Sequence, residues 1–103
     1  MKAEQFLKEL KKLVEDLKAQ DVVVMDLSEF PTCGRYHLIM TATSPPHINA
    51  LVREIKKFSK GKVQHVEGLL ARQWVLIDCK DIIIHIFTQQ AREFYDIERL
   101  WKM

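Results

Sequence analysis

Two apolar segments near the end of the chain are joined by only two residues, and this spacing constrains the fold more than any other feature. The segments are WVLIDC at 74–79 and IIIHIF at 82–87, with Lys80 and Asp81 between them. A two-residue connection between β-branched runs predicts a tight antiparallel hairpin. Because strand side chains alternate between faces, Trp74, Leu76 and Asp78 share one face while Val75, Ile77 and Cys79 share the other.

The first half of the chain supplies further elements of this sheet. Apolar residues recur at helical spacing over residues 2–20, which predicts an amphipathic helix. Residues 22–27, VVVMDL, begin with a β-branched run and are mostly apolar, which predicts a strand covered on both faces. The segment EFPTCGR is typical of a loop, and a second strand is expected over 36–42.

Capping residues mark two more helices. Ser44 is a candidate N-cap followed by Pro45, and Gly61 is well placed to end that helix. Thr88 is the candidate cap of a last helix over about 89–101, with Phe94, Ile97 and Trp101 along one side. With a further strand expected at 62–67, the order is α-β-β-α-β-β-β-α. This order predicts one α+β domain over residues 1–103, with a single mixed five-stranded sheet and packed helices. Since only three helices are available to cover the sheet, some apolar surface is expected to stay exposed as a partner site.

Composition excludes several classes of protein. The chain has 103 residues with a net charge of +2, so charge alone does not indicate nucleic-acid binding. No apolar run approaches the roughly 20 residues that span a bilayer. The N-terminus mixes charged and apolar residues, unlike a signal peptide. The widely spaced Cys33 and Cys79 are interpreted as free thiols of a cytoplasmic protein.

The residues that carry catalysis are largely missing. The histidines show no metal-ligand spacing, and the three glycines are isolated, so neither a metal site nor a phosphate loop is expected. Cys33, beside Gly34, is the best candidate nucleophile but lacks a nearby partner. Asp26 is the only acid in the first two strands, whereas two-metal chemistry needs clustered carboxylates. We therefore expect no enzyme activity and no cofactor, and interpret His85 as a hydrogen-bonded structural histidine.

The last third of the chain resembles the C-terminal signature of the ribosomal silencing factors, also called the Iojap family. That signature combines E-G, W-x-L-x-D, a turn, H-x-F and R-x-F-Y-x-L-E-x-L-W. In this sequence it is matched by Glu67, Gly68, Trp74, Leu76, Asp78, Asp81, His85, Phe87, Arg92, Phe94, Tyr95, Glu98, Leu100 and Trp101. The front half is similar as well, through LKAQDVVVMDL and YHLIMTATSPPHINALVREI.

Four positions depart from the family pattern. Arg35 stands where aspartate is usual, His37 where phenylalanine is common, and Ala42 and Lys80 where the family has glycine. Lys80 lies in the two-residue turn, so we expect slight strain there.

The resemblance implies a fold similar to the nucleotidyltransferase core without its catalytic motifs. It also implies binding to the large ribosomal subunit through the fourteenth large-subunit ribosomal protein. By this resemblance, the bound protein occupies the face of the large subunit where the small subunit joins. It thereby blocks joining and silences translation when nutrients run low. Some members form homodimers, so a second copy of this chain is a further candidate partner. A protein bound at this place on the ribosome could also lie close to ribosomal RNA.

For the docking surface we expect apolar anchors at Trp74 and Leu76, with Tyr95 beside them. Asp78, Asp81 and Glu98 are expected to pair with basic groups of the ribosomal protein. Phe94, Leu100 and Trp101 are interpreted as core residues that hold the last helix to the sheet.

Two alternatives stay open. One is a nucleotidyltransferase relative that uses Asp26. The other is a direct RNA-binding module that uses the lysines near the end of the second helix, Lys56, Lys57, Lys60 and Lys62, although lysines there also suit the helix dipole.

Overall fold

The structure, a computed structural model, describes residues 2–27 and 35–101, with only the backbone described at residues 2, 100 and 101. The elements follow in the order α1 (Lys2–Asp16), β1 (Gln20–Asp26), β2 (Tyr36–Ala42), α2 (Pro45–Phe58), β3 (His65–Glu67), β4 (Trp74–Asp78), β5 (Ile82–Thr88), α3 (Gln89–Tyr95) and α4 (Ile97–Trp101). The expectations for the 29–34 loop, for Cys33 and for the side chains of Leu100 and Trp101 lie outside the described part.

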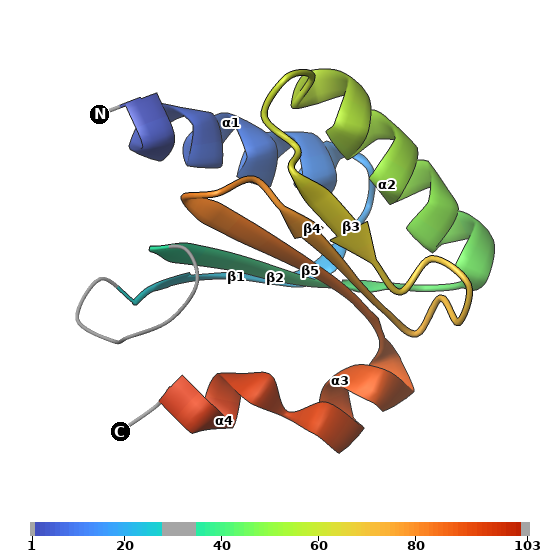
Figure 1. Ribbon diagram of the computed structural model, residues 1–103. Helices are drawn as coiled ribbons and strands as arrows, with labels where there is room; N and C mark the ends of the chain where they lie inside the picture. The colour runs from blue at the N-terminus through green and yellow to red at the C-terminus, as the bar shows by residue number, and fades with distance from the viewer. Residues whose placement is uncertain (1, 28–34, 102–103) are drawn as a thin grey trace.

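The strands form one mixed sheet in the order β1-β2-β5-β4-β3. Only β2 and β5 run parallel, and the other described pairs are antiparallel, including the β4–β5 hairpin. The helices α1 and α2 lie on one face of this sheet, and α3 and α4 lie on the other (Figure 1). The predicted α+β architecture with one five-stranded sheet is therefore confirmed.

The main core lies between the sheet and α1 with α2. The apolar stripe of α2, Ile48, Leu51, Val52 and Ile55, is buried there. It packs against inward side chains of the central strands, including Leu38, Met40, Val75, Ile77, Ile84 and Ile86. Both predicted caps are present: the Ser44 Oγ accepts from the His47 N–H at 3.2 Å, and the Thr88 Oγ1 accepts from the Ala91 N–H at 3.1 Å.

Two boundaries in the first half differ from expectation. The first helix ends at Asp16 rather than near 20, because Lys18 adopts a left-handed φ of 71°. The Lys18 and Ala19 N–H groups bond the carbonyls of Glu15 and Val14, which is the Schellman ending of a helix. The strand expected to be covered on both faces is β1, an edge strand in which Val24 and Asp26 are exposed. A run of valines in the sequence does not reveal whether another strand pairs with the outer edge of this strand.

The last third contains two more differences. The strand expected at 62–67 is only three residues long, His65–Glu67. The single final helix is broken into α3 and α4 by Asp96, which has a left-handed φ of 45°. Aspartate tolerates this conformation better than most residues, so the sequence breaks the helix here without a glycine that would have indicated the break. In the part of the chain that is described, no helix is both long and apolar enough to cross a membrane.

Candidate partner-binding surface

The sheet face opposite α1 and α2 is only partly covered. A small buried cluster of Ile39, Phe87, Ala91 and Ile97 fixes α3 and α4 to the middle of this face. Trp74 and Met25 pack at its margins and are partly buried. Beyond Trp74, the outward side chains of β4 continue with Leu76 and Asp78, which are also partly buried. The two short helices therefore leave one side of the face accessible along β4.

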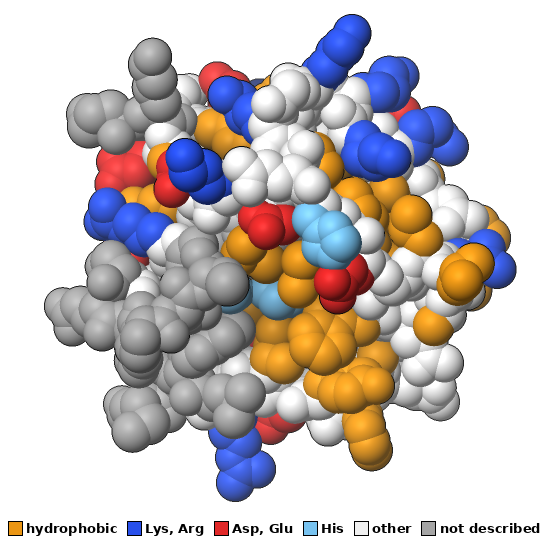
Figure 2. All heavy atoms as spheres, in the orientation of Figure 1, with side chains coloured by type: hydrophobic (Ala, Val, Ile, Leu, Met, Phe, Trp, Pro, Cys, Tyr) orange, Lys and Arg blue, Asp and Glu red, His pale blue; other side chains and the backbone are white. Residues whose placement is uncertain are grey.

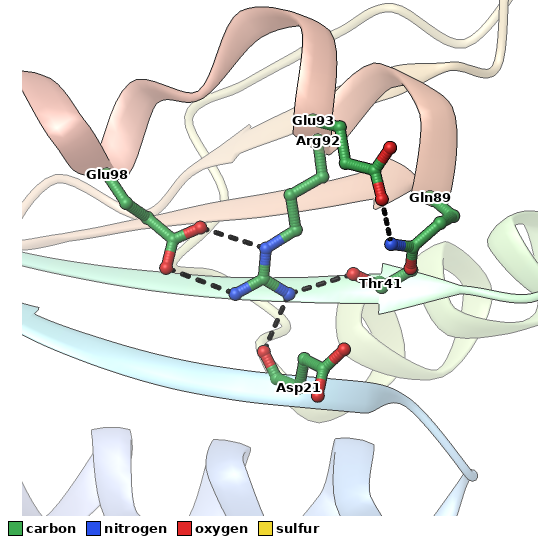
Figure 3. A network of polar contacts seen from close by, with 6 residues as sticks. All are labelled: Asp21, Thr41, Gln89, Arg92, Glu93 and Glu98. Carbon is green, nitrogen blue, oxygen red and sulfur yellow. Dashed lines mark hydrogen bonds and ion pairs between the residues drawn. The ribbon is translucent and has the colours of Figure 1, made fainter.

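Arg92 anchors the two C-terminal helices, α3 and α4, to strands β1 and β2 of the sheet. Its Nε and Nη2 donate to the two carboxylate oxygens of Glu98 at 2.9 and 3.2 Å. Its Nη1 donates to the Asp21 carbonyl of β1 at 2.7 Å and to the Thr41 Oγ1 of β2 at 2.8 Å (Figure 3). The ion pair is largely shielded, with 12% and 16% of the two side chains exposed. Arg92 thus joins α3, α4, β1 and β2 through one guanidinium group.

A second polar group lies beneath the accessible side. The Trp74 indole Nε1 donates to His85 Nδ1 at 3.1 Å, and His85 Nε2 lies 2.9 Å from His37 Nδ1. Since the indole can only donate, His85 Nδ1 carries no proton, and the neutral ring donates through Nε2 to His37. Both imidazoles are buried. Burial, and secondly the charge of His37, lowers the pKa of His85 to about 3. The prediction of a hydrogen-bonded structural histidine is confirmed.

Trp74 is held by packing as well as by this hydrogen bond. Its ring centroid lies 4.9 Å from that of Phe87 and 4.9 Å from that of Tyr95. Backbone geometry fixes the start of β4: at Gly68, with φ of +90°, an added Cβ would lie 2.1 Å from the Trp74 carbonyl oxygen. The glycine of the E-G pair is therefore required by a close backbone approach, and Trp74 begins the strand in one defined position.

Large apolar side chains are exposed next to Trp74. Tyr95 is 48% exposed, and Phe94 is 81% exposed with its ring edge against Tyr95. Leu69 and Leu70 lie in the connection 68–73 that leads into Trp74, and Leu70 is 98% exposed. Figure 2 shows hydrophobic side chains gathered on this face, in the lower right of the view. We call Trp74, Leu76, Phe94 and Tyr95 the aromatic patch; it confirms that apolar surface stays exposed.

The interpretation of Phe94 as a core residue is wrong. A continuous helix would have placed Phe94 on the same side as Ile97, which is buried. The break at Asp96 changes the phase between α3 and α4, so Phe94 faces outward while Ile97 faces the sheet. Sequence reasoning also missed the role of Arg92, which lies in α3 and whose partners come from three other elements, α4, β1 and β2.

The expected docking residues are gathered only in part. Trp74, Leu76 and Asp78 share one face of β4, as their alternation predicts, and Tyr95 packs on Trp74. Asp81 lies in the turn after β4, at the opposite end of that strand from Trp74. Glu98 points toward β1 and β2 in its ion pair with Arg92 (Figure 3). The Asp78 carboxylate accepts the Lys80 N–H at 2.8 Å, which braces the turn where Lys80 adopts a φ of 74°.

Groups suited to catalysis are not assembled among the described side chains. Within residues 2–27 and 35–101, no three His, Cys, Asp or Glu residues could hold one metal ion. Cys79 is a buried free thiol, and burial raises its pKa to about 11, which opposes formation of a nucleophilic thiolate. Asp26 pairs with Arg35 at 3.4 Å. The reversed charge at Arg35 is thus answered by an acid on the neighbouring strand.

Comparison with known proteins places the chain in one family. A family model described as "Ribosomal silencing factor during starvation" matches residues 1–103. The ribosomal silencing factors RsfS of Bacillus subtilis and Zymomonas mobilis are 31% and 33% identical over 84% and 95% of this chain, and in each case over 76% of the relative. A crystal structure of a Chromobacterium violaceum protein is 27% identical and superposes with a TM-score of 0.89, covering 98% of this chain and 87% of that one. The chain therefore belongs to the family of ribosomal silencing factors, which are ribosome-associated regulators.

Proposed function

We propose that this protein binds the large ribosomal subunit in the cytoplasm, through the fourteenth ribosomal protein of that subunit. Bound there, it prevents joining of the small subunit and represses translation when nutrients are limiting. The family's description as silencing factors during starvation supports the outcome. The choice of partner protein rests on the resemblance of the C-terminal signature.

The exposed aromatic patch is the observation that carries the proposal. Interfaces are enriched in aromatic residues at their centre, and a few such residues supply most of the binding free energy. Phe94 and Tyr95 expose large rings, and Trp74 and Leu76 continue the patch along β4. The break at Asp96 turns Phe94 outward, and a partner that covers this ring would account for a large apolar side chain in that position.

One acidic group beside the patch, and a second in the turn at the opposite end of β4 from Trp74, suit a basic partner. Asp78 lies on the same face of β4 as Trp74, and Asp81 follows in the turn. Such charges mainly guide encounter and orientation. Glu98 has a different part in this proposal: its carboxylate stays with Arg92 and keeps α4, and thereby the patch, in place.

The proposed mechanism is steric exclusion and requires no chemical reaction. The fold has a radius of gyration of 12.6 Å and extends 33 × 31 × 22 Å. A rigid object of this size on the face where two subunits meet prevents their close contact, and no bond is made or broken. This accounts for a site composed of aromatic rings and structural hydrogen bonds.

Sedimentation of purified subunits tests the proposal. The protein is expected to migrate with the large subunit, and not with the small one, and to reduce the fraction of joined particles. Phe94→Ser removes an exposed ring without disturbing the core, and should weaken binding by about 1–3 kcal/mol if that ring is an anchor. Val24→Ser is the matched control, because Val24 is exposed on the opposite edge strand, β1.

Two results would contradict the proposal. The first is a protein that stays at the top of the gradient at concentrations well above that of the subunits. The second is a bound protein that leaves subunit joining unchanged. Equal affinity of Phe94→Ser and Val24→Ser would remove the aromatic patch from the interface.

A further inference from the structure

We propose that the end of α2 forms a second binding surface, for single-stranded RNA, on the opposite layer of the molecule from the aromatic patch. The surface consists of Phe58 with Lys56, Lys57, Lys60 and Lys62. It goes beyond the proposed docking to a ribosomal protein, because its partner is a nucleic acid and its contacts are separate.

Phe58 supplies a stacking platform. Its ring lies parallel to that of Phe6, with a centroid separation of 5.7 Å and an interplanar angle of 2°. Phe58 is 41% exposed, although it is the last residue of α2 and continues the helix face that is otherwise buried. The Lys62 Nζ lies 5.2 Å from the Phe6 ring centroid, so a cation is fixed beside the ring pair. A planar ring flanked by cations is the arrangement on which unpaired bases stack.

The lysines around Phe58 carry an excess of positive charge. Residues 45–62 contain five Lys or Arg and one acid, Glu54. Glu54 pairs with Arg53 at 3.3 Å and with Lys57 at 3.7 Å, and these contacts are exposed. Asp81 lines a pocket together with Phe6 and Lys62, so two carboxylates face the five cations and do not neutralise them. The remaining positive charge faces solvent, where Lys56 and Lys60 are exposed.

Charge is divided between the two layers of the fold. Within the described residues, α1, α2 and the turns that follow them (2–19 and 45–62) hold ten Lys or Arg and five Asp or Glu, whereas the remainder holds five and eight. Figure 2 shows Lys and Arg side chains gathered at the upper right, over α2, away from the hydrophobic side chains below. One layer is therefore suited to phosphates and the other to a basic protein.

The helix dipole alone does not explain this surface. Lysines in the last turn favour a helix C-terminus, and that argument covers Lys56 and Lys57. Lys60 and Lys62 lie beyond the helix, which ends at Phe58, and the dipole gives no reason to expose an aromatic ring. An acidic protein could also cover an exposed ring, but a ring placed between cations matches the alternation of base and phosphate along single-stranded RNA.

Fluorescence anisotropy with a labelled 12-nucleotide single-stranded RNA tests the proposal on the whole chain. Contact with three or four phosphates predicts that affinity falls about 20–50-fold between 50 and 200 mM salt. Lys56→Gln with Lys60→Gln should weaken binding at least about fivefold, and so should Phe58→Leu, which keeps the contact with Phe6 but removes the stacking ring. Lys8→Gln with Lys12→Gln, the same charge change on α1, should change affinity less than about twofold, because acids are interleaved along that helix.

Any of three results would overturn the proposal: no binding of RNA at 50 mM salt, an equal loss from both lysine pairs, or unchanged affinity of Phe58→Leu. The Lys56 and Lys60 substitutions alter only exposed side chains, so they remain informative if Phe58→Leu does not fold. Phe94→Ser should leave RNA affinity unchanged. Failure of large-subunit docking through the aromatic patch and failure of RNA binding are therefore separate outcomes.

Discussion

Mild acid is expected to destabilise the fold through His85. In the folded chain this imidazole is 3% exposed and uncharged, and burial lowers its pKa from 6.5 to about 3. In the unfolded chain it binds a proton near pH 6.5. Between these two values the unfolded state therefore holds more protons than the folded state. The stability is fully present above pH 6.5 and is lost as the pH falls toward 3.

The size of this effect follows from the two pKa values. Between pH 7.5 and 5.0, the difference in proton binding amounts to about 2 kcal/mol of unfolding free energy, and the full shift to pH 3 to about 4–5 kcal/mol. The loss above pH 5 is the informative part, because most carboxylates are still ionised there. Against a total stability of roughly 5–15 kcal/mol, a loss of about 2 kcal/mol is readily measured.

Urea unfolding followed by tryptophan fluorescence at several pH values between 7.5 and 5.0 measures the loss. His85→Gln is the decisive variant: its amide can accept from Trp74 and donate toward His37, but it does not titrate. It is expected to start less stable at pH 7.5, since the ring packing is lost, and to show a flatter pH dependence. His65→Gln is the matched control, because His65 is exposed at the edge of the sheet and pairs only at the surface with Glu67.

A loss of less than about 0.5 kcal/mol in the parent between pH 7.5 and 5.0 would contradict this role of His85. So would a folded His85→Gln variant that keeps the slope of the parent, because the proton taken up on unfolding would then belong to another group.

Three further substitutions test the local geometry by their urea midpoints. Arg92→Ala should cost about 2–4 kcal/mol, because it leaves the shielded Glu98 carboxylate without its cation, and Glu98→Gln should cost less. Lys80→Gly should stabilise the hairpin by up to about 1 kcal/mol, since φ of 74° strains lysine but not glycine; an unchanged midpoint would show that the turn is relaxed. Gly68→Ala should cost about 2 kcal/mol or more, because its Cβ would collide with the Trp74 carbonyl oxygen; a stable alanine variant would contradict the close approach.

Sequence reasoning succeeded where local patterns decide the structure. The two-residue connection at Lys80 and Asp81 gave the β4–β5 hairpin, and Ser44 and Thr88 cap the helices they were expected to cap. The alternation in β4 put Trp74 and Leu76 on one face, and β5 put His85 in a hydrogen-bonded interior position. Each of these signals lies within a few residues of the feature that it predicts.

The misses have a common physical origin in tertiary placement. Burial of a valine-rich strand depends on its place in the sheet, and β1 lies at the edge, since among the described strands it pairs with β2 alone. The exposure of Phe94 depends on one left-handed residue, Asp96, and aspartate is ordinary in helices and turns alike. The contacts of Arg92 with Asp21 and Thr41 span 71 and 51 positions. No local pattern encodes such distances.

The contacts of Arg92 and the hydrogen bonds of Trp74, His85 and His37 share one explanation if the proposed docking surface needs a rigid anchor. A partly exposed tryptophan that rotates freely loses entropy on binding, which weakens the interface. Here the indole N–H is taken up by His85, the ring packs between Phe87 and Tyr95, and Arg92 fixes the helix that carries Tyr95. An apolar residue at position 85 would leave the inner indole N–H without its acceptor, at a cost of about 1–3 kcal/mol. The buried histidine and the shielded arginine thus suit a role as supports of the proposed docking surface better than a role in catalysis.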